Sequence, residues 1–185
     1  MGLNVPTVST GKKYTIEDYL KLDDGQSYEL IEGELILVPR PRTKHQKIAN
    51  RFFANLDRFV LMNNLGEVNG DVDVYLEEEV VAPDVFFVAK ERLTIVGEMN
   101  IQGAPDLVVE VLSPSTARYD RKKKSRLYFR NGVKEYWLAD PDQQLVEVLV
   151  AGEKEWKWIG VFDREDILTS NLLPGLEINL GEIFR

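Results

Sequence analysis

Two short apolar segments, each containing one acid, constrain the fold of this chain more than any other feature. The stretch PDLVVEVLSPST (residues 105–116) is a largely β-branched apolar run with Glu110 set inside it. The stretch APDVFFV (residues 82–88) is similar, with Asp84 at the start of its apolar run. Both are typical of buried strands. Because an ionised carboxylate without a partner loses several kcal/mol on leaving water, such acids are usually paired or metal-bound.

Antiparallel pairing of these two strands would place both acids at one edge of a sheet. Asp84 begins its strand, and Glu110 stands near the end of its own. Asp106 has the same side-chain parity as Glu110, but four residues of strand span roughly 13 Å, so we expect Asp106 at the far end. Carboxylates about 4 Å apart repel by roughly 4 kcal/mol at an effective dielectric of 20. A divalent metal, a lysine or a shared proton would relieve this repulsion, and oxygen ligands favour Mg²⁺ or Mn²⁺.

A predicted helix after the second strand supplies the nearest cations. Lys124 lies three residues before Leu127 and four before Tyr128, so it shares their apolar face. Lys123 is the next candidate on this criterion, whereas Lys122 points elsewhere. An inward-facing lysine needs an anionic partner, and two carboxylates at the sheet edge would supply one.

The same helix carries a strongly basic segment on an acidic chain. RYDRKKKSR (residues 118–126) holds six cations, whereas the net charge of the whole chain is −8. That net charge argues against non-specific coating of nucleic acid, but one basic segment can dock a polyanion locally. Arg121 and Lys122 are the residues that we expect to contact a DNA backbone. The alternative is a solvated helix face on which Asp120 and Lys124 form an ordinary surface pair.

Length and composition fit one compact domain with a substantial core, since 44% of the 185 residues are hydrophobic. No apolar run approaches the roughly 18 residues of a membrane span, and the N-terminus lacks the apolar middle of a signal peptide. The absence of cysteine excludes disulfides and thiolate metal sites. We therefore expect a cytoplasmic protein without a membrane partner, with a flexible arm at residues 1–13 and one domain over residues 14–185.

Periodicity and turn residues predict alternating strands and helices. Helices are expected over residues 15–22, 43–63 and about 115–131, the last ended by Gly132. Strands are expected at residues 27–39 (a pair around a Glu32-Gly33 turn), 66–78, 85–88, 107–112, 134–140 and 143–162 (a hairpin turning near Gly152), before a final short strand and helical turn. This order predicts an α/β fold with a central mixed β-sheet flanked by helices and added β-hairpins at both ends.

Three stretches resemble a known family: residues 28–49 (YELIEGELILVPRPRTKHQKIA), residues 82–88 and residues 103–141. They are similar to the Uma family of restriction-like endonucleases, within the PD-(D/E)XK nuclease superfamily. The segments EVLSPST and GVKEYWLADP are specific, whereas a lone PD dipeptide carries no weight. The resemblance covers about residues 14–149 and implies a restriction-endonuclease-like nuclease domain over residues 14–185.

Position by position, the resemblance implies a metal-dependent site. It makes Asp84 the acid of the PD element and Glu110 the acid of the second element, both as ligands of Mg²⁺ or Mn²⁺. The superfamily commonly has a lysine two residues after the second acid, where this chain has Leu112. In this family the lysine has moved to the next helix, where Lys124 matches, and the resemblance therefore implies Lys124 as the third catalytic residue.

Two further residues match family positions. His45, the only histidine, is implied as a contact to the scissile phosphate or to a water molecule. Glu29 is implied as a remote metal ligand, with Glu32 beside it. The alternatives are a structural histidine near a helix start and solvated acids in a hairpin.

Aromatic residues at alternating strand positions allow two interpretations. We favour sheet packing over a base-stacking platform for Tyr136, Trp137, Trp156 and Trp158. The chain has no phosphate-binding loop, dinucleotide fingerprint or HExxH motif. A triad built on the only histidine has no nucleophile-elbow motif to support it.

The leading function hypothesis is an Mg²⁺-dependent endonuclease that hydrolyses DNA phosphodiester bonds, with DNA as its partner and a homodimer allowed. The alternative is a catalytically inactive nuclease-fold module that binds nucleic acid or a protein partner. A hydrolase for smaller phosphate esters is a third hypothesis. Divalent-ion binding separates the first from the second, and substrate length separates the first from the third.

Overall fold

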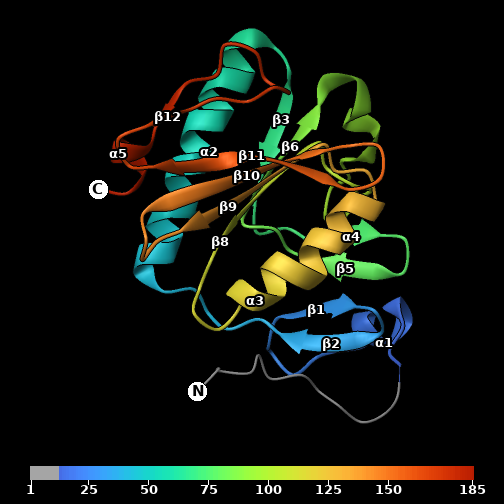
Figure 1. Ribbon diagram of the computed structural model, residues 1–185. Helices are drawn as coiled ribbons and strands as arrows, with labels where there is room; N and C mark the ends of the chain where they lie inside the picture. Colours follow the sequence, from blue (N-terminus) through green and yellow to red (C-terminus); the bar gives the residue numbers. More distant parts are fainter. Residues whose placement is uncertain (1–12) are drawn as a thin grey trace.

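The computed structural model describes residues 13–185, which form two large β-sheets and a two-stranded one, with helices packed on them (Figure 1). The arm predicted at residues 1–13 lies, except for its last residue, outside the described residues. No helix among residues 13–185 is both long and apolar enough to cross a membrane.

The larger sheet has six strands in the order β11-β10-β9-β8-β6-β3. They are β3 (Gly66–Asn69), β6 (Val85–Ala89), β8 (Leu107–Val111), β9 (Glu135–Asp140), β10 (Leu145–Ala151) and β11 (Trp156–Asp163). β8 and β9 are parallel, and the other neighbouring pairs are antiparallel. Every residue of β6 and β8 is buried, which explains why both strands read as continuous apolar runs.

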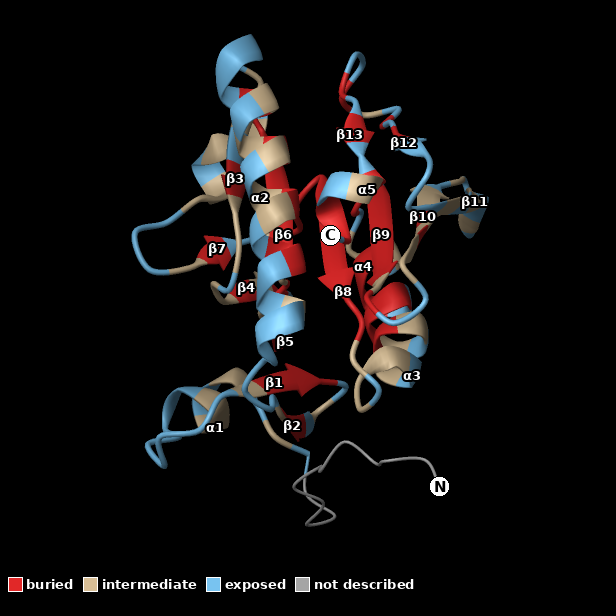
Figure 2. Ribbon diagram, turned by 90° about the vertical axis from the view of Figure 1, so that its left-hand side faces the viewer, coloured by how far each residue is buried: buried red, intermediate tan, exposed pale blue. Residues whose placement is uncertain are grey.

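Helices cover both faces of this sheet (Figures 1 and 2). α2 (Thr43–Asn63) packs on the face that includes Val109 and Trp137. α3 (Ala117–Tyr119), η2 (Asp120–Lys124) and α4 (Ser125–Arg130) follow β8, and α4 packs on the opposite face. The buried positions of α2 include Ile48, Phe52, Leu56 and Val60, which recur at helical spacing.

The smaller sheet has five strands in the order β2-β1-β5-β4-β7. They are β1 (Tyr28–Ile31), β2 (Glu34–Leu37), β4 (Val74–Leu76), β5 (Glu79–Val81) and β7 (Ile101–Gln102). α1 (Ile16–Leu20) precedes this sheet, and Thr15 caps it with Asp18 in a capping box, as predicted. The β1–β2 hairpin turns at Glu32 and Gly33, also as predicted.

The single strand expected over residues 66–78 is wrong, because β3 and β4 belong to different sheets. The chain turns between them, and Asp71 there has a positive φ of 55°. The Asp71 N–H donates to the Pro83 carbonyl at 3.0 Å. A Cβ at Gly70 would collide with the Asp84 carbonyl oxygen, so the close approach of these segments requires glycine. The segment alternates like one strand in sequence, but this tertiary contact divides it into two strands.

The helix expected over about residues 115–131 is present but not continuous. Its middle, η2, is a π-helical segment rather than an α-helical one. Gly132, with a φ of +87°, ends it as predicted. The remaining elements are η1 (Lys90–Ile95), β12 (Ile167–Leu168), β13 (Ile178–Asn179) and α5 (Leu180–Ile183). β10 and β11 form the hairpin predicted around Gly152.

Asp106 anchors the end of the larger sheet that lies opposite Glu110 on strand β8. Its fully buried carboxylate accepts a hydrogen bond from the Ala89 N–H at 2.9 Å. The same carboxylate pairs with Arg92 at 2.9 Å and with Lys134 at 2.8 Å. Burial alone would raise the pKa of Asp106, but these donors lower it below its ordinary value. Asp106 is therefore an ionised structural residue. It lies at the far end of the strand from Glu110, as predicted.

We expect Asp106→Asn to lower the free energy of unfolding by about 2–3 kcal/mol at neutral pH, since it removes the buried carboxylate that accepts charged hydrogen bonds from Arg92 and Lys134. Because the folded-state pKa is lowered, this stabilisation is present above the ordinary carboxyl pKa and is lost as pH falls through the folded-state value. The gap between the two proteins in urea unfolding should therefore narrow below about pH 4. Asp142→Asn is the control, because its pair with Lys44 is exposed and is worth at most about 1 kcal/mol. Equal losses in both variants would contradict this role.

Candidate active site

Asp84 and Glu110 lie on adjacent strands at one end of the larger sheet. β6 and β8 pair antiparallel with Val85 opposite Val109, so the residue before Val85 faces the residue after Val109. This is the pairing that the sequence predicts. Burial raises the pKa of Glu110 well above its ordinary value, and the charge of Asp84 contributes to the shift. The two carboxylates are thus close enough to repel each other.

His45 and the backbone of β8 hold the Asp84 carboxylate in place. Its Oδ2 accepts the Val111 N–H at 2.7 Å and lies 3.3 Å from His45 Nε2. His45 reaches this position from the first turn of α2. Burial alone would lower the pKa of His45, but the hydrogen bond and charge of Asp84 raise it above its ordinary value. The Asp84 side chain keeps 23% of its surface exposed, so this is the open end of the site.

Two buried donors converge on one oxygen of Glu110. Tyr128 donates its hydroxyl proton to Oε1 at 2.6 Å, and the Lys124 ammonium donates to the same atom at 3.0 Å. The sequence marks Tyr128 only as part of an apolar helix face, and its hydrogen bond to the acid was missed. The spacing of Tyr128, four residues after Lys124, is the signal that could have found it.

Lys124 lies among three carboxylates and has only 7% of its side chain exposed. Its Nζ is 2.7 Å from Glu29, 3.0 Å from Glu110 and 3.8 Å from Asp120. Burial alone would lower the pKa of Lys124, but these anions raise it well above its ordinary value. The side chain is therefore a buried cation, held protonated by its partners.

The π-helical segment η2 brings Asp120 and Lys124 into the site together. Both residues are buried, whereas their neighbours at positions 121–123 are not. The alternative of an Asp120–Lys124 pair on the surface is therefore wrong, because the two residues do pair but are buried. Burial, partly offset by Lys124 and by a hydrogen bond from Thr116, raises the pKa of Asp120 to about 6. π-Helical turns occur mostly as single irregular turns, frequently at functional sites. No residue pattern indicates this turn, so the position of Asp120 in the buried cluster was missed.

Glu29 joins the site from the smaller sheet. It lies on β1, has 5% of its side chain exposed, and accepts the Ala82 N–H at 3.2 Å in addition to its contact with Lys124. It is therefore not a solvated hairpin acid. Glu32 is placed differently, at the exposed β1–β2 turn, with its carboxylate 3.9 Å from Lys123.

The other cations of the basic segment lie outside the buried cluster. Arg121 forms an ion pair with Glu147 on β10. Lys123 pairs with Glu34 on β2 at 2.5 Å. Lys122 is exposed. Of the two residues expected to contact a DNA backbone, Lys122 is therefore the more accessible.

The aromatic residues divide between packing and exposure. Tyr136 and Trp137 are fully buried, and Trp156 is half-buried, with its indole N–H donating to the Ser125 carbonyl at 2.9 Å. For these three residues the sheet-packing interpretation is confirmed. Trp158 does not fit it, because 63% of this residue is exposed.

The donor chemistry of the site fits a hard divalent cation. Three carboxylates, those of Glu110, Glu29 and Asp120, contact one buried ammonium, and Asp84 lies beside Glu110 across the strand pair, so acidic groups outnumber the cation. Carboxylate oxygens are the ligands that Mg²⁺ and Mn²⁺ prefer. As they stand, no three His, Asp or Glu side chains within residues 13–185 form a group arranged to hold a metal ion. The acidic residues fit the ion in charge and ligand type. In this structure their oxygens also accept hydrogen bonds from the protein: Asp84 from the Val111 N–H, and Glu110 from Lys124 and Tyr128.

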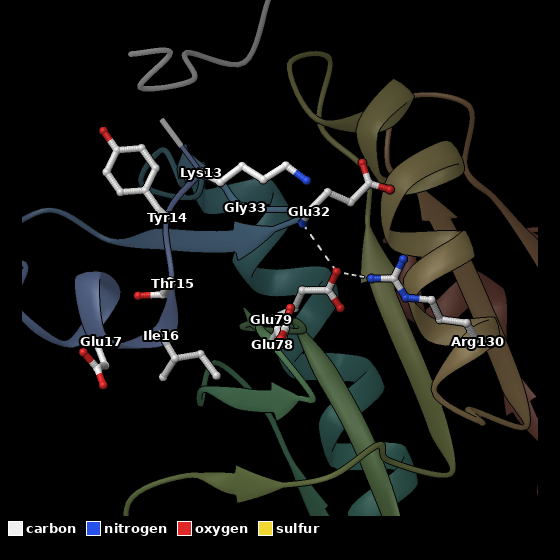
Figure 3. A pocket seen from close by; sticks show the side chains of 10 residues that line it. All are labelled: Lys13, Tyr14, Thr15, Ile16, Glu17, Glu32, Gly33, Glu78, Glu79 and Arg130. Carbon is white, nitrogen blue, oxygen red and sulfur yellow. Dashed lines mark hydrogen bonds and ion pairs between the residues drawn. The ribbon is translucent and has the colours of Figure 1, made fainter. Parts of the chain in front are cut away.

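A separate pocket lies between α1, the β1–β2 turn, β5 and α4 (Figure 3). Glu79 occupies one wall, where its carboxylate pairs with Arg130 and accepts the Glu32 N–H at 3.4 Å. None of Asp84, Glu110, Glu29 and Asp120 lines this pocket. The candidate chemistry thus lies at the end of the larger sheet, not in this pocket.

The chain is similar to one protein family and to a solved structure. Residues 16–181 match the Uma2 family, which is described as "Putative restriction endonuclease". The chain is 29% identical over 161 residues to "Uncharacterized protein sll1609" of Synechocystis sp., an alignment that covers 80% of this chain and 88% of that protein. A crystal structure described as "a putative nuclease belonging to DUF820 from Anabaena variabilis ATCC 29413" superposes with a TM-score of 0.77 at 24% identity, covering 92% of this chain and 97% of the other. This likeness confirms the predicted fold class.

Two adjacent buried tyrosines allow the hydrogen bond to Glu110 to be tested. Tyr128→Phe removes a donor to a carboxylate and should lower the free energy of unfolding by about 2 kcal/mol. Tyr136→Phe is the matched control. The Tyr136 hydroxyl donates to the main-chain carbonyl of Asp120, a neutral acceptor, at 3.2 Å, and loss of this hydrogen bond should cost about 1 kcal/mol. Urea unfolding of both variants measures the difference, and a larger loss for Tyr136→Phe would contradict the assignment.

Proposed function

Because the chain belongs to the Uma2 family of restriction-endonuclease-like nucleases, we propose that it is a divalent-metal-dependent endonuclease that hydrolyses phosphodiester bonds of DNA. The observation that carries this proposal is the buried Lys124 ammonium, which lies 3.0 Å from Glu110. Glu110 in turn lies on β8, the strand paired with β6, at whose start Asp84 stands. Two acids and a lysine in one place supply both a cation site and a positive charge for a phosphate.

In this proposal Asp84 and Glu110 would hold one Mg²⁺ or Mn²⁺ ion, and the main-chain carbonyl of Val111 would offer a further oxygen. Such an ion, when bound, lowers the pKa of a coordinated water and stabilises negative charge on the phosphate. Glu29 and Asp120 contribute the remaining negative charge around Lys124, which favours a cation at this end of the sheet.

Lys124 acts in this scheme as a fixed cation. Since its carboxylate partners keep it protonated, it is suited to orient the attacking water or to neutralise charge that develops on the phosphate, and not to abstract a proton. In the proposed scheme His45, which contacts Asp84 at the more exposed side of the site, would bind the scissile phosphate or order a water.

The basic segment would dock the DNA backbone beside the site. Lys122 is exposed, as are Arg118 and Arg126, so these cations are available to phosphates. Arg121 would first have to leave its pair with Glu147 or share it. On a chain with a net charge of −8, such contacts are local, which suits an enzyme that engages DNA at one face.

Metal-dependent cleavage of supercoiled and linear DNA by the purified protein tests the proposal directly. Lys124→Met keeps the aliphatic stem but leaves Glu29, Glu110 and Asp120 without their cation, so we expect a less stable protein. Assayed at temperatures where it stays folded, it should still bind metal but lose at least about 10²-fold in cleavage rate, as is typical when one transition-state donor is removed. Lys122→Met is the control and should be close to wild type in the chemical step. Equal cleavage by both variants would exclude Lys124 from the chemistry. DNA binding without cleavage in either metal would instead indicate an inactive nuclease-fold module.

A second measurement tests the metal site without relying on cleavage. An ion that binds only the folded protein stabilises it by roughly 2.7 kcal/mol at 100 times its dissociation constant. Mg²⁺ or Mn²⁺ should therefore raise the melting temperature of the wild type, and Glu110→Ala should lose this response. Glu147→Ala is the control, because Glu147 lies outside the buried cluster and should leave the response intact. An unchanged response in Glu110→Ala would place the ion elsewhere.

A further inference from the structure

Like β3, strand β11 is one of the two edge strands of the larger sheet. It pairs with β10 on one side, and no strand within residues 13–185 pairs with it on the other. Figure 2 shows β11 at the margin of the molecule, coloured as exposed and intermediate. An exposed edge offers unpaired N–H and C=O groups to a further strand.

The side chains of β11 are unusual for an edge that stays unpaired. Trp158 is 63% exposed, Ile159 47% and Val161 45%. Ile167, just beyond the strand, is 47% exposed. Proteins commonly protect a free edge with lysine, proline, a bulge or a covering segment, and a cluster of exposed apolar residues marks an interaction surface. β11 has a bulge, but its exposed centre is apolar.

The register of β11 allows it to pair with its own copy. Trp158 and Val161 lie opposite Leu149 and Glu147, which are two residues apart on β10, so both side chains point to the same face. The bulge adds Ile159 between them. With a two-fold axis at Gly160, Trp158 of each chain would lie opposite Val161 of the partner subunit. Such an aromatic–β-branched pair stabilises antiparallel strands, and the symmetry forms it twice.

Charges at the two ends of β11 select the antiparallel arrangement. Lys157 lies near one end and Asp163 at the other, and both are exposed. Two-fold pairing brings the lysine end of one strand beside the aspartate end of the other, whereas parallel pairing would bring like charges together. Nucleic acid is a poorer occupant for this edge, because Ile159 and Val161 offer neither charge nor an aromatic face.

We propose that two copies of this chain associate through antiparallel pairing of β11 with β11, about an axis at Gly160. The pairing joins the two larger sheets into one continuous sheet. Glu110 lies on β8, three strands away, which is roughly 14 Å at the spacing of paired strands. The interface therefore leaves Asp84 and His45 uncovered, and the inference does not depend on the proposed nuclease activity.

Sedimentation of the full chain at increasing concentration tests this interface. We expect a dimer for the wild type, and Trp158→Lys and Val161→Lys should each raise the dimer dissociation constant at least about tenfold. Met62→Lys is the matched control, because Met62 is an exposed apolar residue on α2 and should leave the dimer unchanged. Circular dichroism melting checks that the variants, which alter exposed side chains, stay folded.

A monomeric wild type at every concentration, or variants as dimeric as the wild type, would overturn the proposal. Acrylamide quenching gives an independent readout, since Trp158 is the most exposed of the three tryptophans and should become protected as concentration rises. If the wild type is monomeric and Trp158→Lys instead loses binding to a single-stranded oligonucleotide, the surface belongs to nucleic acid and the dimer is excluded.

Discussion

The Lys124 ammonium is buried among carboxylates from three separate parts of the chain, and the arrangement of those parts depends on it. Glu29 comes from the smaller sheet, Glu110 from the larger sheet, and Asp120 from the π-helical turn. A buried charge without partners costs several kcal/mol, so no segment can withdraw without leaving another group uncompensated. Apolar packing brings the two sheets and the helix together, and the ion pairs then fix their relative positions.

The acid pair of the site was predictable because it depends on local pattern and strand direction. Asp84 and Glu110 each accompany a short run of buried apolar residues, and antiparallel pairing follows from few alternatives. The inward direction of Lys124 was predictable for the same reason, since the helix shows its apolar face through Leu127 and Tyr128. Asp106 shows that spacing along a strand separates acids of the site from structural acids. It lies at the other end of the strand that carries Glu110 and pairs with cations there.

The features that the sequence did not reveal depend on contacts between distant segments. The turn at Gly70 separates β3 from β4 because the backbone there passes close to Asp84, and the apolar alternation of the segment carries no sign of that approach. The π-helical turn likewise has no residue signature, so Asp120 entered the sequence analysis only as the partner of Lys124 in the alternative of a surface ion pair. Trp158 followed the alternation of a packed strand, but β11 has no neighbour on its outer side within the described residues.

The π-helical turn also makes this part of the chain sensitive to length. Each residue of an α-helix advances about 100° around the axis, so a one-residue deletion between Asp120 and Lys124 would rotate the two ends of the helix relative to each other by that amount. Asp120 would then lie on the other side of Lys124 and lose its present contact at 3.8 Å, although every side chain of the site would still be present. Insertions and deletions here should therefore be far less acceptable than most substitutions at the exposed position 122. The length of the segment, as much as its composition, carries the information that builds the site.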